Sequence, residues 1–465
     1  MNVVQQQLIE EIRARFGERA AITDAADIEP WLTDWRKRWT GRAAAILQPS
    51  STDQVAAMVG LAAANGVALV PQGGNTSMVG GATPPEDGSA LILSLRRMNR
   101  IRSIETGHAV VEAGVILETL HHAATENGQR FPLTLGARGS ATIGGLISTN
   151  AGGTQVLRFG PMRALVEGIE AVLPDGTIHH GLSGLKKDNR GTSIDQLLIG
   201  AEGTLGIVTA ARLRLVPAIT SRAVAWLGLA SPQAALDTLR ALEARTDRVE
   251  GFEILPAESL RAALDHIPDT RAPLAEEHRW HALVEMVGEG AGDLIGELLQ
   301  PLLERALVED AVISASEAQA KAFWRIRDSL SEAERVAFGP ATQHDISVPL
   351  DAMPRFLAEA AAEVERAFPG SKASGFGHLG DGNIHFHVRA GTRGGPDWIN
   401  SEGQAVTRLV DDLVTAAGGS ISAEHGIGQM KRDELARLSP DRVRTLKAIK
   451  AALDPKGLMN PGKLV

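Results

Sequence analysis

The residues best suited to carry chemistry are four histidines near the end of the chain, in two short motifs that also hold a carboxylate. They are His378, His385, His387 and His425, with Glu424 directly before the last. Asp381-Gly382 predicts a hairpin turn. On the strand after it, His385 and His387 would share one face, with His378 beside them. Three imidazoles and a carboxylate suit Zn²⁺, Mn²⁺ or Co²⁺; the alternative is a group of hydrogen-bonded histidines at a strand end.

Three glycine-dense segments form a second feature with chemical potential. The first covers residues 71–77, and its two glycines allow a turn that aims successive N–H groups at one point. Such a nest neutralises a pyrophosphate, although a plain tight turn at a strand end fits equally well. The second holds six glycines within 18 residues, 136–153. Glycine inside an element costs about 0.5–1 kcal/mol, so this density indicates close approach of backbone to a ligand. The third covers residues 199–208.

Composition limits the classes of protein to consider. The chain has 465 residues, a formal charge of −9, 44% hydrophobic residues, and neither cysteine nor tyrosine. This is a globular composition, which predicts two or three domains. The absence of cysteine excludes disulfides, thiolate metal sites, iron–sulfur clusters and a cysteinyl flavin link. The acidic balance, without a basic block, argues against a nucleic-acid partner.

The apolar segments predict a protein that does not span a membrane. The stretch 56–70 is too short for a span, and the first 17 residues lack the pattern of a secretory signal. Together these features favour a cytoplasmic location.

The elements that must position these residues follow from periodicity and turn signals. Ser50-Ser51-Thr52-Asp53 predicts the start of a helix that ends at Asn65-Gly66, and a buried strand follows over 67–70. Further strands are expected near 90–95, 109–112, 168–173 and 206–215. A composition shift near residue 218 separates a glycine-rich ligand-binding domain from a different α+β domain. A helical pattern covers 317–338, where Arg327 and Ser331 would share a face.

The motifs PQGGNTS, LGARGSATIGGLISTNAGG and GAEGTLGIVT resemble the FAD-binding domain of the vanillyl-alcohol oxidase / p-cresol methylhydroxylase superfamily. Within it, the chain is similar to the D-2-hydroxyacid dehydrogenase branch, and to D-2-hydroxyglutarate dehydrogenases in particular, from about residue 40 to the end. The resemblance implies an α+β, two-domain flavoprotein. Its parts would be an FAD-binding domain over 1–217, a substrate or cap domain over 218–415, and a segment over 416–465 that returns to the FAD domain.

The resemblance also implies which residues bind FAD. The pyrophosphate would lie against Gln72, Gly73, Gly74, Asn75, Thr76, Ser77 and Met78. The isoalloxazine and ribityl would lie against Gly136, Ser140, Gly144, Gly145, Asn150 and Gly153, with Gly203 and Ile207 near the adenine and Asn460 near the cofactor. Many relatives attach the flavin through a histidine in the first loop. That loop has no histidine here, so noncovalent FAD is expected.

The family pattern assigns the remaining chemistry. It makes His378, His385 and Glu424 the ligands of a divalent metal, Zn or Mn, and His425 the base that removes the hydroxyl proton. A structural histidine beside a metal ligand is the alternative for His425. The position of His387 commonly carries asparagine in the hydroxyglutarate enzymes, so this imidazole would reach the substrate or replace a water ligand.

Substrate recognition follows from the same resemblance. The helical periodicity alone predicts that Arg327 is a solvated helix residue. The resemblance implies instead that Arg327 holds a substrate carboxylate, helped by the residue at Ser331. Asn383, just after the turn, is a weaker candidate, and its position favours a turn-capping amide. Gln343 stands where the hydroxyglutarate enzymes commonly carry a carboxylate-binding lysine. It brings no charge, which leaves room for a monocarboxylate.

Together these features predict an FAD- and metal-dependent D-2-hydroxyacid dehydrogenase, with D-2-hydroxyglutarate as first choice. D-lactate or a broader set of hydroxy acids is the second reading, and a flavin subunit of a complex like glycolate oxidase is the third. The resemblance favours an electron-transfer flavoprotein or a quinone as electron acceptor. The family often dimerises, so a homodimer is among the expected assemblies.

Overall fold

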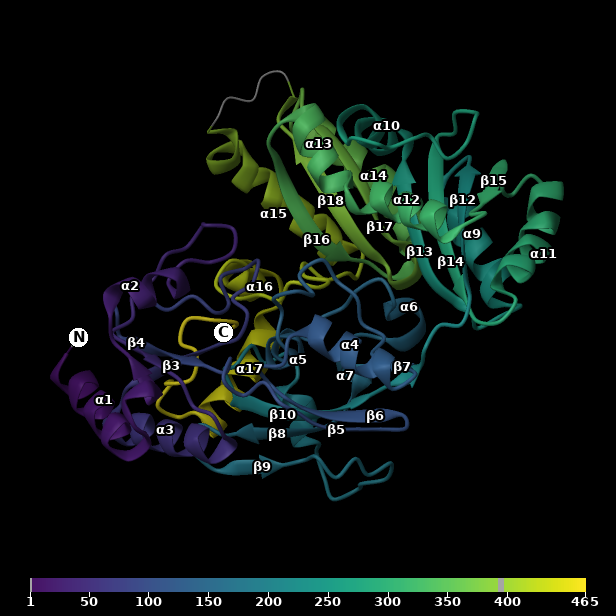
Figure 1. Ribbon diagram of the computed structural model, residues 1–465. Coiled ribbons are helices and arrows are strands. Elements are labelled where there is room, and N and C mark those ends of the chain that lie inside the picture. Colours follow the sequence, from purple (N-terminus) through teal and green to yellow (C-terminus); the bar gives the residue numbers. More distant parts are fainter. Residues whose placement is uncertain (1, 392–396) are drawn as a thin grey trace. The chain divides into compact units, whose positions relative to one another are not determined.

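The chain folds into two compact units (Figure 1). The computed structural model describes residues 2–391 and 397–465. Unit 1 comprises Met1–Gly153, Gly160–Ala218 and Glu424–Val465, and unit 2 comprises Thr154–Phe159 and Ile219–Ala423. Both units mix helices and sheets, which confirms the predicted α+β class.

The first part of unit 1 is a four-stranded sheet covered by helices. The strand order is β1 (Ala21–Ile22), β2 (Ile46–Leu47), β4 (Ala90–Ser94), β3 (Ala68–Gln72), and the last three strands run parallel. Helix α3 (Thr52–Asn65) follows the prediction: Ser51 Oγ accepts from the N–H of Gln54, and Gly66 ends the helix at φ 66°. Helices α1 (Val3–Phe16) and α2 (Ala25–Ile28) precede it. Leu8, Met58 and Leu69 share one core.

A five-stranded antiparallel sheet completes the scaffold of unit 1. Its order is β5 (Ile101–Glu105), β6 (His108–Glu112), β10 (Ile207–Arg214), β8 (Val166–Val172), β9 (Ile178–His180). The short strands β7 (Gln129–Arg130) and β11 (Val216–Pro217) pair with each other. The helices around this sheet are α4 (Leu117–Glu126), α5 (Ile143–Thr149), α7 (Met162–Leu165) and α8 (Ile194–Leu198).

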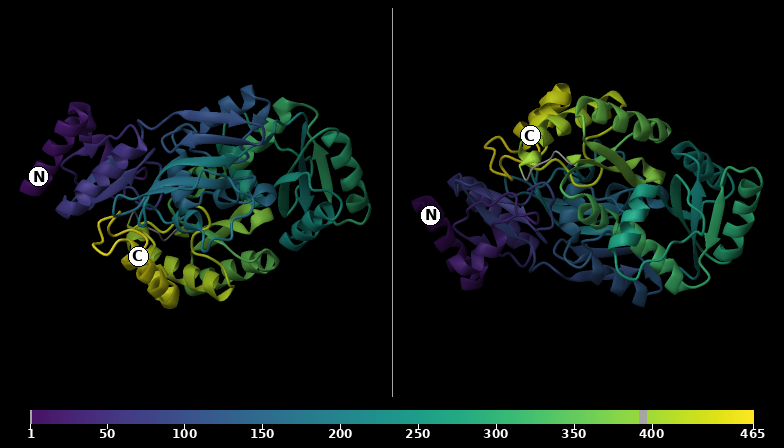
Figure 2. Two further views of the ribbon diagram at one scale, coloured as in Figure 1. Left: turned by 90° about the horizontal axis from the view of Figure 1, so that it is seen from below. Right: turned by 90° about the horizontal axis from the view of Figure 1, so that it is seen from above.

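The end of the chain belongs to unit 1. After α16 (Arg432–Leu438) and α17 (Pro440–Leu453), the final turns lie beside β3, where Leu69 N–H donates to Leu458 O and Asn460 N–H donates to Leu69 O, both at 2.8 Å. These turns are yellow in Figures 1 and 2. These two hydrogen bonds hold the end of the chain against β3.

Unit 2 is built on one seven-stranded antiparallel sheet. Its order is β15 (Asp310–Ile313), β12 (Arg222–Leu229), β14 (Trp280–Val287), β13 (Val249–Pro256), β17 (Lys372–His378), β18 (Asn383–Arg389), β16 (Ala341–Ser347). One core joins it to α9 (Pro232–Glu243), α11 (Ala291–Glu304), α14 (Met353–Ala367) and α15 (Glu402–Ala416). A second core joins it to α10 (Ala257–His266), α12 (Glu317–Asp328) and α13 (Leu330–Phe338). The short helix α6 (Val156–Phe159) also belongs here.

The predicted helix over 317–338 is interrupted, so Arg327 and Ser331 do not share a face. The break falls at Ser329, whose hydroxyl donates to Arg325 O at 2.7 Å. A serine that bonds the preceding turn in this way bends helices. As a result Arg327 is buried and Ser331 is exposed.

None of the described helices combines the length and the apolar content that a bilayer span requires.

Candidate functional site

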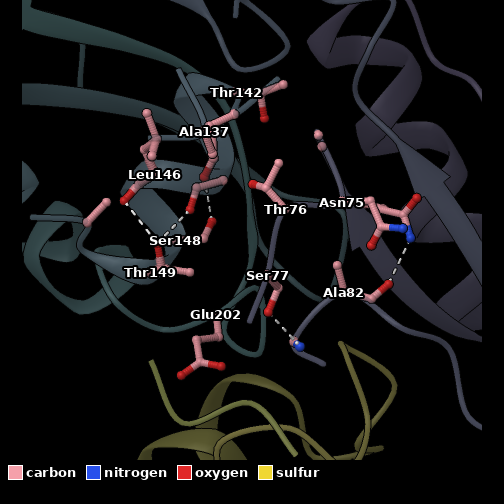
Figure 3. Close-up of a pocket in the computed structure, with 18 of the residues that line it drawn as sticks. Asn75, Thr76, Ser77, Ala82, Ala137, Thr142, Leu146, Ser148, Thr149 and Glu202 are labelled. Carbon is pink, nitrogen blue, oxygen red and sulfur yellow. Dashed lines mark hydrogen bonds between the residues drawn. The ribbon is translucent and has the colours of Figure 1, made fainter. Parts of the chain in front are cut away.

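A cavity of about 620 Å³ lies in unit 1, where all three glycine segments meet (Figure 3). This volume is typical of ligand and cofactor pockets. The predicted residues that line it are Gln72, Gly73, Gly74, Asn75, Thr76, Ser77, Met78, Gly136, Ser140, Gly144, Gly145, Gly203, Ile207 and Asn460. Three segments that are far apart in the sequence therefore build one wall.

The first glycine loop is fixed by its own polar side chains. Asn75 has φ 55°, and its Nδ2 donates to Thr33 O at 2.9 Å. Ser77 Oγ accepts from the N–H of Gly81 at 3.0 Å. At Gly74 a Cβ would lie only 2.0 Å from Ser140 O, so glycine is required where the first and second segments touch. Close packing of the two backbones thus explains part of the glycine density.

Three buried oxygen atoms on the cavity wall have no hydrogen-bond partner among the residues that the structure describes. They are Gln72 Oε1, Thr142 Oγ1 and Asn460 Oδ1. Orphaned buried polar atoms are rare in native proteins and usually mark a missing ligand or water. FAD carries ribityl hydroxyls and ring N–H groups that donate to such oxygens. The wall therefore fits this cofactor, and Gln72, Thr142 and Asn460 are the side chains that could hold it.

Two predicted cofactor residues do not line the cavity. Asn150 ends α5 in the left-handed conformation, and its Oδ1 accepts from the N–H of Arg163 at 2.9 Å. A Cβ at Gly153 would lie 2.1 Å from Thr134 O, so a neighbouring backbone explains this glycine. Sequence reasoning also missed wall residues, among them Trp35, Thr142 and Glu202. No sequence pattern around Trp35 indicates a cofactor site, whereas Thr142 lies in the second glycine segment and Glu202 in the third.

Glu424 and His425 also line this cavity. They begin the segment by which the chain returns to unit 1. The cavity wall thus combines a carboxylate and an imidazole with the three glycine segments, which is the composition that acid–base chemistry beside a bound cofactor requires.

The remaining predicted histidines lie together on one face of the sheet in unit 2. The β17–β18 hairpin forms as expected, with His378 opposite Asn383, and its turn ends at Gly382 with φ 77°. The ring centroids of His378 and His385 are 5.5 Å apart. The ring centroid of Phe376 lies 5.4 Å from that of His385 and 5.3 Å from that of His387. Burial and the charge of Arg327 lower the pKa of His385 well below its ordinary value.

A buried glutamate joins two of the predicted functional groups of unit 2. Glu253, opposite His378 in the β13–β17 register, accepts from His378 Nδ1 at 2.6 Å and from Arg327 Nε at 2.6 Å. Burial raises the pKa of Glu253, but the charges of Arg327 and His378 outweigh it and hold that pKa below its usual value. Arg327 is therefore part of a buried ion pair and not a solvated helix residue.

His387 has a comparable arrangement. Its Nδ1 lies 2.7 Å from Glu334 Oε2, and Ser259 Oγ donates to the other oxygen of Glu334. Burial raises the pKa of Glu334, but the hydrogen bond and the charge of His387 outweigh burial and hold that pKa below its usual value. Two buried carboxylates thus fix two imidazoles through Nδ1, a pattern that orients the opposite ring nitrogen.

Three further substrate candidates differ in their environment. Gln343 lies opposite His387 on β16 and is exposed, as is Ser331. Asn383 is buried, and its Nδ2 donates to Asp345 Oδ1 at 3.0 Å and to Ile346 O at 2.9 Å. Its Oδ1 has no partner.

Over residues 2–391 and 397–465, no group of three or more His, Cys, Asp or Glu side chains is arranged to hold a metal ion. Of the predicted ligands, His378 and His385 belong to unit 2 and Glu424 to unit 1.

Comparison with known families agrees with the chemistry of the cavity. Residues 219–464 match the family described as FAD linked oxidases, C-terminal domain, and residues 43–181 match the FAD binding domain. The chain belongs to the FAD-linked oxidase family. It is an oxidoreductase whose cofactor is FAD.

Curated relatives cover nearly the whole chain. A D-2-hydroxyglutarate dehydrogenase of Xanthomonas citri pv. viticola is 38% identical over 95% of this chain and 93% of its own. The mitochondrial D-2-hydroxyglutarate dehydrogenase of Bos taurus is 36% identical, covering 96% and 81%. A putative mitochondrial D-lactate dehydrogenase of Schizosaccharomyces pombe is 33% identical, covering 95% and 86%.

Solved structures support the fold. The 4-ethylphenol oxidase from Gulosibacter chungangensis superposes with a TM-score of 0.71 at 19% identity, covering 100% of this chain and 97% of its own. p-Cresol methylhydroxylase gives 0.73 at 15% identity with the same coverage. These similarities confirm the predicted vanillyl-alcohol oxidase / p-cresol methylhydroxylase architecture.

Proposed function

We propose that this oxidoreductase converts a D-2-hydroxy acid into the corresponding 2-oxo acid, with D-2-hydroxyglutarate as first choice. The observation that carries the proposal is the cavity of unit 1, where the three glycine segments share a wall with Glu424 and His425. The names of the two relatives at 38% and 36% identity support the choice of substrate.

FAD, when bound, supplies the acceptor for the hydride that leaves the substrate carbon. The glycine segments would hold it through backbone N–H groups, and Gln72, Thr142 and Asn460 would offer acceptor oxygens. His425 takes the hydroxyl proton, because an imidazole exchanges protons near neutral pH.

A divalent ion, Zn or Mn, on His378, His385 and Glu424 is part of the proposal. It is supported by the ligand types and by the 5.5 Å between the two rings. The described residues form no complete metal group, so no step of the mechanism is assigned to the ion.

Substrate selectivity is assigned to unit 2. Arg327, with Ser331 and Asn383, would contact the carboxylate and hydroxyl of the substrate, and His387 would contact its distal part. Gln343 favours the second candidate, D-lactate or another monocarboxylate, because it lacks the charge that would hold a second carboxylate. The relative named as a putative D-lactate dehydrogenase is consistent with this alternative.

The surroundings of the enzyme complete the proposal. An electron-transfer flavoprotein or a quinone would reoxidise the flavin, in the cytoplasm, and a homodimer is the proposed assembly.

The role of His425 is tested with the His425→Ala variant. We expect FAD to remain bound and turnover of D-2-hydroxyglutarate with an artificial acceptor to fall by about two to four orders of magnitude, the usual contribution of a general base. Exposed His266, in α10 of unit 2, provides the control substitution His266→Ala, which should leave turnover unchanged. Unimpaired turnover in His425→Ala would refute the assigned role.

A further inference from the structure

Glu202 is a buried carboxylate on the wall of the FAD cavity, with an exposed fraction of 8%. Its Oε1 accepts from the N–H of Ile427, and its Oε2 accepts from the N–H of Gly428, each at 2.8 Å. These two residues follow His425 by two and three positions. Figure 3 shows the carboxylate pointing toward the C-terminal segment.

The electrostatics of Glu202 favour a fixed arrangement. Burial raises the pKa of Glu202 above its ordinary value, and the two backbone donors and the charges of Lys463 and Lys431 reduce that rise without reversing it. Hydrogen bonds to an ionised acceptor are shorter and stronger than neutral ones. Inside a low-dielectric cavity wall, each of the two N–H groups therefore stabilises the carboxylate that receives it.

The backbone of Glu202 is held as tightly as its side chain. Glu202 has φ 52°, a left-handed conformation that a non-glycine residue keeps only when its surroundings impose it. Its N–H donates to Ser148 O at 2.8 Å, and its carbonyl accepts from Asn460 Nδ2 at 2.6 Å. The backbone of Glu202 is thus anchored to two other parts of the cavity wall.

The turn after His425 has little room to move away from Glu202. Gly426 has φ 82°, and a Cβ there would lie 3.0 Å from Glu202 Oε1. A Cβ on Gly428 would lie 2.3 Å from Val79 O, in the segment that follows the first glycine loop. The turn is therefore enclosed by Glu202 of the third glycine segment on one side and by Val79, just after the first glycine segment, on the other.

We propose that Glu202 is a positioning residue, whose carboxylate fixes the backbone after His425 and thereby sets the direction of its imidazole in the cavity. This inference rests on the proposed function, in which His425 is the base. It gives the glutamate of the GAEGT segment a role in catalysis that does not involve contact with substrate.

The test uses full-length holoenzyme and the variant Glu202→Gln. Glutamine keeps the shape but presents an NH₂ group to one of the two N–H donors. We expect FAD affinity and KM for D-2-hydroxyglutarate to stay within threefold of the parent. The rate constant of anaerobic flavin reduction should fall at least tenfold. Glu167→Gln, in β8 of the same unit and partnered by Arg212, is the matched control and should leave that rate constant unchanged.

A double variant separates positioning from a general structural role. Because Glu202 acts through His425, adding Glu202→Gln to His425→Ala should change the residual reduction rate by less than twofold. A further tenfold loss, or release of FAD from Glu202→Gln, would overturn the proposal. So would a parental reduction rate in Glu202→Gln. If His425→Ala itself reduces flavin normally, the proposed function fails, a result distinct from failure of this inference.

A second variant covers the case in which Glu202→Gln does not fold. Glu202→Asp keeps two acceptor oxygens on a shorter side chain. We expect it to retain FAD and to lose reduction rate severalfold. A parental rate in Glu202→Asp would overturn the proposal in the same way.

Discussion

Gly74 offers the sharpest test of how the glycine segments build the FAD cavity. In the Gly74→Ala variant the new Cβ would start 2.0 Å from Ser140 O, and real Cβ atoms essentially never come within 3.0 Å of a neighbour. The first and second segments must therefore separate by roughly 1 Å. Overpacking of this kind costs about 1–3 kcal/mol. If the strain is relieved when the cofactor leaves, the Kd for FAD rises by about five- to 150-fold.

The assay is a titration of apoprotein with FAD, followed by flavin fluorescence, for Gly74→Ala and for Gly60→Ala. Gly60 lies in α3 of the same unit, and a Cβ there has no neighbour within 4 Å. Gly60→Ala should bind FAD like the parent and be about 0.5–1 kcal/mol more stable, because alanine favours the helix. A Kd within twofold of the parent for Gly74→Ala would refute the reasoning.

Three further predictions concern unit 2 and the metal. Burial and the neighbouring His278 lower the pKa of His281 to about 4. When the pH falls from 7.5 to 5, the unfolded chain takes up the proton first, so the free energy of unfolding falls by about 2 kcal/mol. His281→Gln keeps an acceptor for Trp226 Nε1. In urea unfolding at pH 7.5 and pH 5, its free energy of unfolding should fall by about 2 kcal/mol less than that of the parent. An equal fall in the two proteins would contradict the assignment. Gln343→Lys should raise kcat/KM for D-2-hydroxyglutarate over D-lactate at least tenfold, whereas an unchanged ratio would remove residue 343 from substrate selection. Dialysis against a chelator should abolish turnover but leave FAD bound, with recovery on adding Zn²⁺ or Mn²⁺; full turnover in metal-free protein would exclude the ion.

Local signals in the sequence predicted local structure well. The caps at Ser51 and Gly66 defined α3, and Asp381-Gly382 defined the β17–β18 hairpin. The glycine segments marked most of the cavity wall, and at Gly73, Gly74 and Gly144 a Cβ would lie within 3.0 Å of a neighbouring residue. The helix caps and the hairpin turn depend on residues close together in the chain, whereas the glycines at 73 and 74 are explained by contacts with the second segment.

Interactions between distant residues were not visible in the sequence. Arg327 is paired with Glu253, 74 positions away, and Glu202 bonds a turn 225 positions away. Nothing in a helical pattern indicates such partners, which is why a solvated Arg327 was the expectation from periodicity alone. The break at Ser329 escaped notice because a serine inside a helix bends it only when its hydroxyl bonds the preceding turn.

The measurement that tests the central claim most directly is an anaerobic visible spectrum of the purified protein during addition of single hydroxy acids. D-2-hydroxyglutarate, its L isomer, D-lactate and D-malate are compared. We predict flavin absorbance that bleaches with D-2-hydroxyglutarate and does not respond to the L isomer. Bleaching mainly by D-lactate would move the assignment to the second candidate. A folded protein without flavin absorbance that takes up no added FAD would contradict the account.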